Sequence, residues 1–406
     1  MYIKDLKINN VKCFDSTAAS FNYPQKHYSS GCRPRFDNIN LLLGENASGK
    51  TTVCQAICLA VLKSLLATSS SGFRSVNFIR KSTNFSTIDA KLVLADVDVS
   101  IKQVEAHTSL KRQGDNEFIE MRGVPPQWAE VLYMDDSPAI FLAAYGANRR
   151  TERPEAYNEN LRCVRYQRVA SLFEPHVGLV PSALAFYRNR ERIAEAIQLL
   201  NRLLPADEIH NIKMKQYVVL ENSDHPYTYL PEPLFDADGV DLPLSGLSDG
   251  YRIFCGWVID LVGHLSRVIP KGIELNKASG VVIVDEIDLL LHPSWQRYVI
   301  ETLAAEFPNI QFIITTHSPI VVGTLDPENI FLIERSEPHT SVISSCSQDV
   351  HGKSIDEILV KVFGLLSPRA PELERQLAEI VKKVQNGDES ATLDYLKLLG
   401  KGVAQN

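Results

Sequence analysis

The sequence contains no apolar run long enough to cross a bilayer, which takes about 20 consecutive apolar residues. Its first residues, Met1 to Leu6, alternate like a strand and do not resemble a signal peptide. None of the seven cysteines forms a Cys-x-x-Cys pair. Cys54 and Cys58 lie four residues apart in an expected helix, where two buried thiols are expected rather than half of a metal site. These absences predict a cytoplasmic protein with no membrane partner.

The sequence also lacks a strong net charge and a sustained heptad repeat. A formal charge of -7 over 406 residues gives no overall field that would attract nucleic acid or a membrane surface. Without heptads, a long coiled-coil arm is excluded. Hydrophobic residues make up 45% of the chain, which suffices for one large domain with an inserted or appended subdomain.

Short apolar strands alternate with helical patterns along the chain. Strands are expected within residues 1–45, as a pair within 87–105, and at 139–145, 280–284 and 311–315. Helices are expected at 50–66, from 248, at 294–307, from 354 and from 371, with helical patterning over 155–205 and a break near 226–233. This alternation predicts an α/β fold with a largely parallel sheet, accompanied by an antiparallel β subdomain and an inserted helical lobe.

A glycine-rich loop with the pattern Gly-x4-Gly-Lys-Thr follows one expected strand and opens a helix. Its backbone N–H groups and the helix N-terminus suit a polyphosphate. Lys50 adds a charge for the β- and γ-phosphates, and the Thr51 hydroxyl suits Mg²⁺. The expected ATP-binding residues are Gly44, Glu45, Asn46, Ala47, Ser48, Gly49, Lys50, Thr51 and Thr52.

A fully apolar run, residues 281–284, ends in Asp285 and Glu286. Open parallel sheets bind ligands at the carboxyl ends of their strands. We expect Asp285 to hold Mg²⁺, directly or through water, and Glu286 to act as the general base on the attacking water. His317 follows the next apolar strand, and we expect it to hydrogen-bond the γ-phosphate and sense its loss.

The segment Leu247-Ser248-Asp249-Gly250-Tyr251 precedes the acidic residues by about thirty positions. With the glycine-rich loop, Asp285-Glu286 and His317 in this order, the chain resembles the ABC ATPase superfamily, whose signature is Leu-Ser-Gly-Gly-Gln. Asp249 and Tyr251 depart from that signature. The resemblance implies a homodimer in which Ser248 and Gly250 of one subunit contact the ATP held by the other.

The stretch from Asp285 to Pro293 narrows the resemblance to the group with RecF, SMC-like and OLD-type ATPases, in which Asp288 and His292 would line the loop that crosses to the partner. The loop from Ala144 to Arg149 and the C-terminal pattern resemble short ATPases of bacterial anti-phage systems, such as the Septu ATPase. Arg149 either reaches a phosphate or the partner, or makes a surface ion pair. His292 is either a loop residue of this kind or a helix cap.

The resemblance implies four segments. Residues 1–150 form the first part of an ABC head, 151–235 an inserted helical lobe, 236–345 the second part of the head, and 346–406 a C-terminal helical segment. A glutamine-bearing loop is not assigned, because Gln103 and Gln167 qualify by order alone.

Arginines and tyrosines interleave after the expected strand at 139–145. They either track a nucleic-acid backbone or form a solvated, ion-paired helical face. The residues are Arg149, Arg150, Arg153, Arg162, Arg165, Arg168, Arg188, Arg190, Arg192, Tyr157, Tyr166 and Tyr187.

Two functions are compatible with these features. The first is an ATPase switch in anti-phage defence or DNA maintenance, which works as a homodimer or higher oligomer and controls a separate nuclease. A fused nuclease is not expected, because the 89 residues after His317 carry no Asp-x-Asp on a strand. The second is a nucleotide-driven DNA clamp or a transporter's ATPase subunit.

Overall fold

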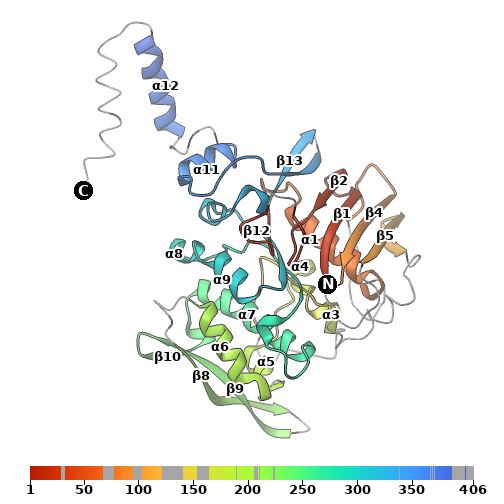
Figure 1. The fold of residues 1–406 in the computed structure, drawn as a ribbon, viewed down its shortest axis with the longest axis vertical. Helices are drawn as coiled ribbons and strands as arrows, with labels where there is room; N and C mark the ends of the chain where they lie inside the picture. Colours follow the sequence, from red (N-terminus) through yellow and green to blue (C-terminus); the bar gives the residue numbers. More distant parts are fainter. Residues whose placement is uncertain are drawn as a thin grey trace. The chain divides into compact units, whose positions relative to one another are not determined.

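The computed structural model describes residues 1–28, 33–66, 77–94, 103–120, 140–152, 164–188, 190–204, 209, 211–222, 225–337, 339–365, 367, 369, 371–385 and 398. They divide into two compact units, Met1–His351 and Gly352–Asn406. Figure 1 labels the elements of both. No helix among the described residues is long and apolar enough to cross a membrane.

A six-stranded sheet forms the centre of the first unit. Its order is β14-β13-β3-β12-β11-β7, and all neighbours run parallel except the edge strand β14. The strands are β3 (Ile39–Gly44), β7 (Leu142–Tyr145), β11 (Gly280–Val284), β12 (Ile310–Thr315), β13 (Ile330–Glu337) and β14 (Thr340–Ser345). Every residue of β11 and β12 is buried, which explains their continuous apolar sequences. The predicted largely parallel sheet is confirmed.

A five-stranded antiparallel sheet, in the order β2-β1-β4-β5-β6, lies beside α1 (Lys50–Leu66). Its strands are β1 (Tyr2–Val11), β2 (Phe14–Ser20), β4 (Phe85–Val93), β5 (Gln103–Gln113) and β6 (Asn116–Glu120). Alternate residues of β5 are buried, as a half-exposed strand requires. Its apolar face, α1 and the parallel sheet share one core. The second strand of the pair expected within 87–105, at Val97 to Ile101, lies outside the described residues.

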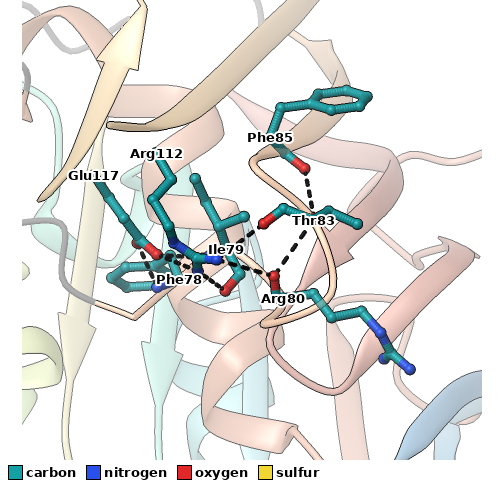
Figure 2. Close-up of polar contacts among 7 residues, drawn as sticks. All are labelled: Phe78, Ile79, Arg80, Thr83, Phe85, Arg112 and Glu117. Carbon is teal, nitrogen blue, oxygen red and sulfur yellow. Dashed lines mark hydrogen bonds and ion pairs between the residues drawn. The ribbon is translucent and has the colours of Figure 1, made fainter. Parts of the chain in front are cut away.

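Two side chains of the hairpin β5–β6 hold residues 78–83, the segment that leads into β4. Figure 2 shows the Glu117 carboxylate accepting hydrogen bonds from the backbone N of Phe78 at 2.7 Å and of Ile79 at 3.1 Å. Arg112 donates to Glu117 at 2.9 Å and to the Thr83 carbonyl at 2.9 Å. The segment is therefore held at both ends by one ion pair.

The expectation of a helical lobe over 151–235 is correct only for its first part. Its described residues up to 203 contain short helices: α3 (Val164–Gln167), α4 (Ala170–Phe173), α5 (Ser182–Arg188) and α6 (Ile193–Leu203). A long hairpin follows, made of β8 (Asn211–Asn222) and β9 (His225–Ala237), and β10 (Val240–Pro243) pairs with the end of β9.

The break expected near 226–233 is wrong, because β9 runs through Pro226, Pro231 and Pro233. Since β10 pairs with β9 only from residue 234 to 237, the proline-containing part has, among the described residues, a hydrogen-bonded neighbour on one side only. Proline is tolerated on such a one-sided strand.

The remaining helices of the first unit are α7 (Asp249–Val268), α8 (Pro293–Gln296), α9 (Val299–Glu306) and α10 (Pro319–Val322). The single helix expected at 294–307 is thus two helices, interrupted at Arg297 and Tyr298. The second unit contains α11 (Ile355–Lys361) and α12 (Pro371–Gln385). The helix expected from residue 354 is confirmed as α11, which begins with a capping box in which Ser354 and Glu357 bond reciprocally.

Candidate nucleotide site

The glycine-rich loop connects β3 to α1, as its sequence context requires. A Cβ atom on Gly44 would lie 2.4 Å from the Ile333 carbonyl oxygen. Gly49 has a φ of +115°, and a Cβ there would lie 2.6 Å from Cys13 Sγ. Both positions therefore exclude a side chain, and the loop backbone lies directly against β13 and the β1–β2 turn.

The Lys50 side chain folds into this loop. Its Nζ donates to the carbonyls of Gly44 at 2.8 Å and Glu45 at 2.9 Å. Desolvation lowers the pKa of Lys50, while the nearby charges of Asp285 and Glu286 oppose that shift. The Ser48 Oγ is buried without a hydrogen-bond partner. Both groups can serve an incoming anion, since Lys50 carries the charge and Ser48 has a free hydroxyl.

The other loop residues differ in exposure. Glu45, Asn46, Ala47 and Thr51 are exposed, whereas Thr52 is buried in the first turn of α1. Of these four exposed residues, only Thr51 forms a hydrogen bond with Asp285, the acidic residue that follows β11.

The Thr51 hydroxyl meets the carboxylate that follows β11. Thr51 Oγ1 donates to Asp285 Oδ2 at 2.7 Å, and Thr315 Oγ1 donates to Asp285 Oδ1 at 2.7 Å. Hydroxyl and carboxylate oxygens are the ligands that Mg²⁺ prefers, and it usually takes one or two protein oxygens with substrate phosphates and waters. This donor set fits that ion, and no cluster of three or more acidic, histidine or cysteine ligands occurs in the described part of the chain.

Glu286 and His317 lie at neighbouring strand ends. Glu286 is partly exposed and has a φ of +52°, in the left-handed region that side chains rarely adopt. Asp288 accepts from Thr316 Oγ1 at 2.5 Å and from His317 N at 3.4 Å. Asp288 therefore ties the loop after β11 to the end of β12 within one chain.

Ser248 is the exposed N-cap residue of α7, and its hydroxyl does not cap the helix. The neighbouring Asp249 pairs with Arg252 at 2.5 Å. A Cβ atom on Gly250 would lie 2.3 Å from the Leu290 carbonyl oxygen. The start of α7 therefore lies against the loop after β11, whose His292 caps α8 by accepting from Ser294 N at 3.3 Å.

Arg149 occupies neither of the positions expected for it. Its side chain is only 2% exposed, and it donates to the carbonyls of Gly146 at 3.0 Å, Asp285 at 2.6 Å and Glu286 at 2.8 Å. Burial lowers the pKa of Arg149 to about 10, and the carboxylates of Asp285, Glu286 and Asp288 oppose the shift. An arginine after a strand reads as a surface residue, and backbone acceptors leave no trace in a sequence.

The arginine-rich segment is not a continuous solvated face: Arg150 is exposed, but other arginines are buried. Arg165 and Arg168 are 2% exposed. Arg165 donates to the Ile140 carbonyl, and the Arg168 guanidinium lies 5.3 Å from the Phe141 ring centroid. Arg153, Arg162 and Tyr157 lie outside the described residues, as do the side chains of Arg188, Arg190 and Tyr187. Gln103 is exposed at the start of β5 and Gln167 ends α3, so neither gains an assignment.

Residues 39–323 match the protein family described as "AAA domain, putative AbiEii toxin, Type IV TA system".

The chain belongs to this family of ATPase domains.

Two curated relatives support this family assignment. The chain is 31% identical to the retron Ec83 probable ATPase of Escherichia coli over 41% of its length. It is 25% identical to the Septu protein PtuA of Bacillus mycoides (strain KBAB4) over 82% of its length. The matched parts cover 30% and 42% of those relatives, so the chain spans under half their length.

An experimental structure shares the fold. The SMC head bound to the C-terminal winged-helix domain of ScpA superposes with a TM-score of 0.55 at 14% identity, and the match covers 86% of this chain and 98% of that one. The fold is therefore that of an SMC-type ATPase head.

Proposed function

We propose that this chain binds and hydrolyses ATP with Mg²⁺, and that two copies close head-to-tail over two nucleotides. The observation that carries the proposal is the 2.7 Å contact between Thr51 and Asp285 beside the Lys50 ammonium. It joins the phosphate-binding loop to the acidic strand end, which a Mg-nucleotide site requires.

The candidate residues have the following roles in this proposal. Lys50 and the loop residues 44–52 bind the phosphates, and Thr51 and Asp285 hold Mg²⁺. Glu286 accepts a proton from the attacking water, and His317 donates to the γ-phosphate. Bound Mg²⁺ would supply charge neutralisation at the phosphates.

The second half of each site comes from the partner subunit. Ser248 supports this role because it is exposed and its hydroxyl is not used to cap α7. The N-terminus of this 20-residue helix carries a positive partial charge that favours an anion. Asp249 opposes the anion, but its pairing with Arg252 offsets that charge.

The cellular role that fits best is a switch in anti-phage defence or DNA maintenance that controls a separate nuclease, as a dimer or a higher oligomer. The likeness to the Septu and retron proteins supports this role. A DNA clamp built on the arginine-rich segment finds less support, because Arg149, Arg165 and Arg168 are buried.

Two experiments test the proposal. ATP hydrolysis by the purified chain is compared with that of Lys50→Ala and Glu286→Gln, and both variants should lose nearly all of the wild-type rate. An inactive wild type, or a Glu286→Gln variant with the wild-type rate, contradicts the catalytic assignment. For the effector, proteins encoded beside this gene are co-purified with the chain, and the absence of a stable nuclease partner contradicts the switch.

A further inference from the structure

The buried Arg149 contacts the chain at the turn that carries Glu286. It ends a short loop after β7, and β7 pairs in parallel with β11 so that Tyr145 lies opposite Val284. The loop therefore begins beside the point where Asp285 and Glu286 leave their own strand. The three acceptors of Arg149 are all main-chain carbonyls.

All four main-chain polar groups of the acidic turn have partners. Asp285 N donates to the Tyr145 carbonyl at 2.8 Å, and Glu286 N donates to Thr315 Oγ1 at 2.8 Å. Arg149 binds both remaining groups, the carbonyls of Asp285 and Glu286, and the Glu286 carbonyl also accepts from Leu289 N at 3.1 Å. One rigid, planar guanidinium thus joins two consecutive carbonyls, a task for which lysine is a poor substitute.

The hydrogen bonds from Arg149 constrain a residue whose backbone is strained. Glu286 has a left-handed φ of +52°, and such a conformation persists only where its surroundings determine it. Loss of Arg149 would remove its hydrogen bonds to both carbonyls and leave the Glu286 carbonyl with the Leu289 N donor alone. The turn would then relax, and the Glu286 carboxylate would change its direction. Burying an arginine at this position is costly, which argues that its carbonyl contacts matter.

We infer that Arg149 is a positioning residue for ATP hydrolysis, which fixes the Glu286 carboxylate through its main chain. The inference rests on the proposed role of Glu286 as general base. The two terminal nitrogens of Arg149 are engaged by main-chain carbonyls, so Arg149 should affect the rate of hydrolysis more than the binding of ATP.

The test compares Arg149→Met with Arg149→Lys and with Arg150→Met, a control at the adjacent exposed arginine. We expect Arg149→Met to lower kcat by about 10- to 100-fold, as loss of an outer-shell partner typically does, with the Kd for ATP changed by less than about threefold. Arg149→Lys keeps the charge and part of the bonding, so it should recover part of the rate. Arg150→Met should match the wild type, and thermal unfolding checks that each variant is folded.

A double variant separates positioning from general destabilisation. If Arg149 acts through Glu286, adding Arg149→Met to Glu286→Gln should not lower the residual rate further, because residues that act as a unit are not additive. Multiplying losses, or a wild-type kcat in Arg149→Met, overturn the inference. If the methionine variant does not fold, the lysine variant enters the same cycle. A wild-type rate in Glu286→Gln alone would instead refute the proposed function.

Discussion

The hydroxyl of Thr51 and the carboxylate of Asp285 lie 2.7 Å apart, although 234 residues separate them in the sequence. The contact exists because β3 and β11 both flank β12 in a parallel arrangement, so their carboxyl ends share one edge. It is the geometric centre of the proposed Mg-ATP site.

Removing the Thr51 hydroxyl should therefore weaken the binding of Mg²⁺. In Thr51→Val, the concentration of Mg²⁺ that gives half-maximal hydrolysis should rise by about tenfold or more, since one oxygen ligand is lost. Thr51→Ser retains the oxygen and should stay close to the wild type. Titrating MgCl₂ at fixed ATP measures both, and equal curves for the two variants would contradict the metal role.

Lys50→Ala should weaken nucleotide binding by on the order of 100-fold, because a charged hydrogen-bond donor to the phosphates disappears. A fluorescent ATP analogue measures the Kd directly. Lys7→Ala, on the exposed side of β1, removes the same charge elsewhere and should bind normally. Unchanged affinity in Lys50→Ala would exclude the glycine-rich loop as the phosphate site.

Gly250→Ala should disturb the contact between α7 and the loop after β11. The added Cβ would meet the Leu290 carbonyl at 2.3 Å, so either the helix start or the loop must shift. Gly246 provides a matched control, since the nearest atom to its Cβ would be Pro243 Cδ at 3.4 Å. We expect ATP-dependent dimer formation to fall in Gly250→Ala and to remain in Gly246→Ala. Equal dimerisation of the two variants would show that this contact is unimportant.

Asp260 provides a test of stability against pH. It lies buried in α7, where it accepts from Tyr145 Oη at 2.9 Å and from Val180 N at 2.8 Å. Burial raises the pKa of Asp260 to about 7, whereas an unfolded aspartate has a pKa of about 3.9. Between these values the folded state holds the extra proton, so the free energy of unfolding should fall as pH rises from about 4 to about 7.

Asp260→Asn cannot titrate and should lack this component. Its stability relative to the wild type should therefore improve steadily from pH 4 to about 7 and then level off. Urea unfolding at several pH values measures the difference. A difference that is constant over this range would mean that Asp260 is already ionised in the folded protein.

Much of the fold follows from the sequence because its strands are unambiguous. Buried parallel strands require continuous apolar runs, and β11 and β12 have them. The sequence did not predict the hairpin β8–β9, because the prolines of β9 suggest a break. Only the pairing pattern shows that these prolines lie on a strand with a neighbour on one side. Such pairing is a property of the fold and leaves no local mark.

The same difference between local motifs and strand pairing applies to the candidate site. The side chains proposed to bind a ligand belong to short, regular motifs, so Lys50, Asp285 and Glu286 could be named in advance. The contacts of Thr315 and Arg149 could not, since their partners are brought together by strand register and, for Arg149, are carbonyls that every residue possesses.

Whether two subunits share each nucleotide is tested by the mass of Glu286→Gln in solution, measured by light scattering with and without Mg-ATP. ATP should double the mass from that of one 45.4 kDa chain, or double that of whatever assembly exists without it. Adding Ser248→Arg should prevent the increase while ATP still binds. A mass that does not change with ATP, or an increase that also occurs with Ser248→Arg, would contradict the shared nucleotide site.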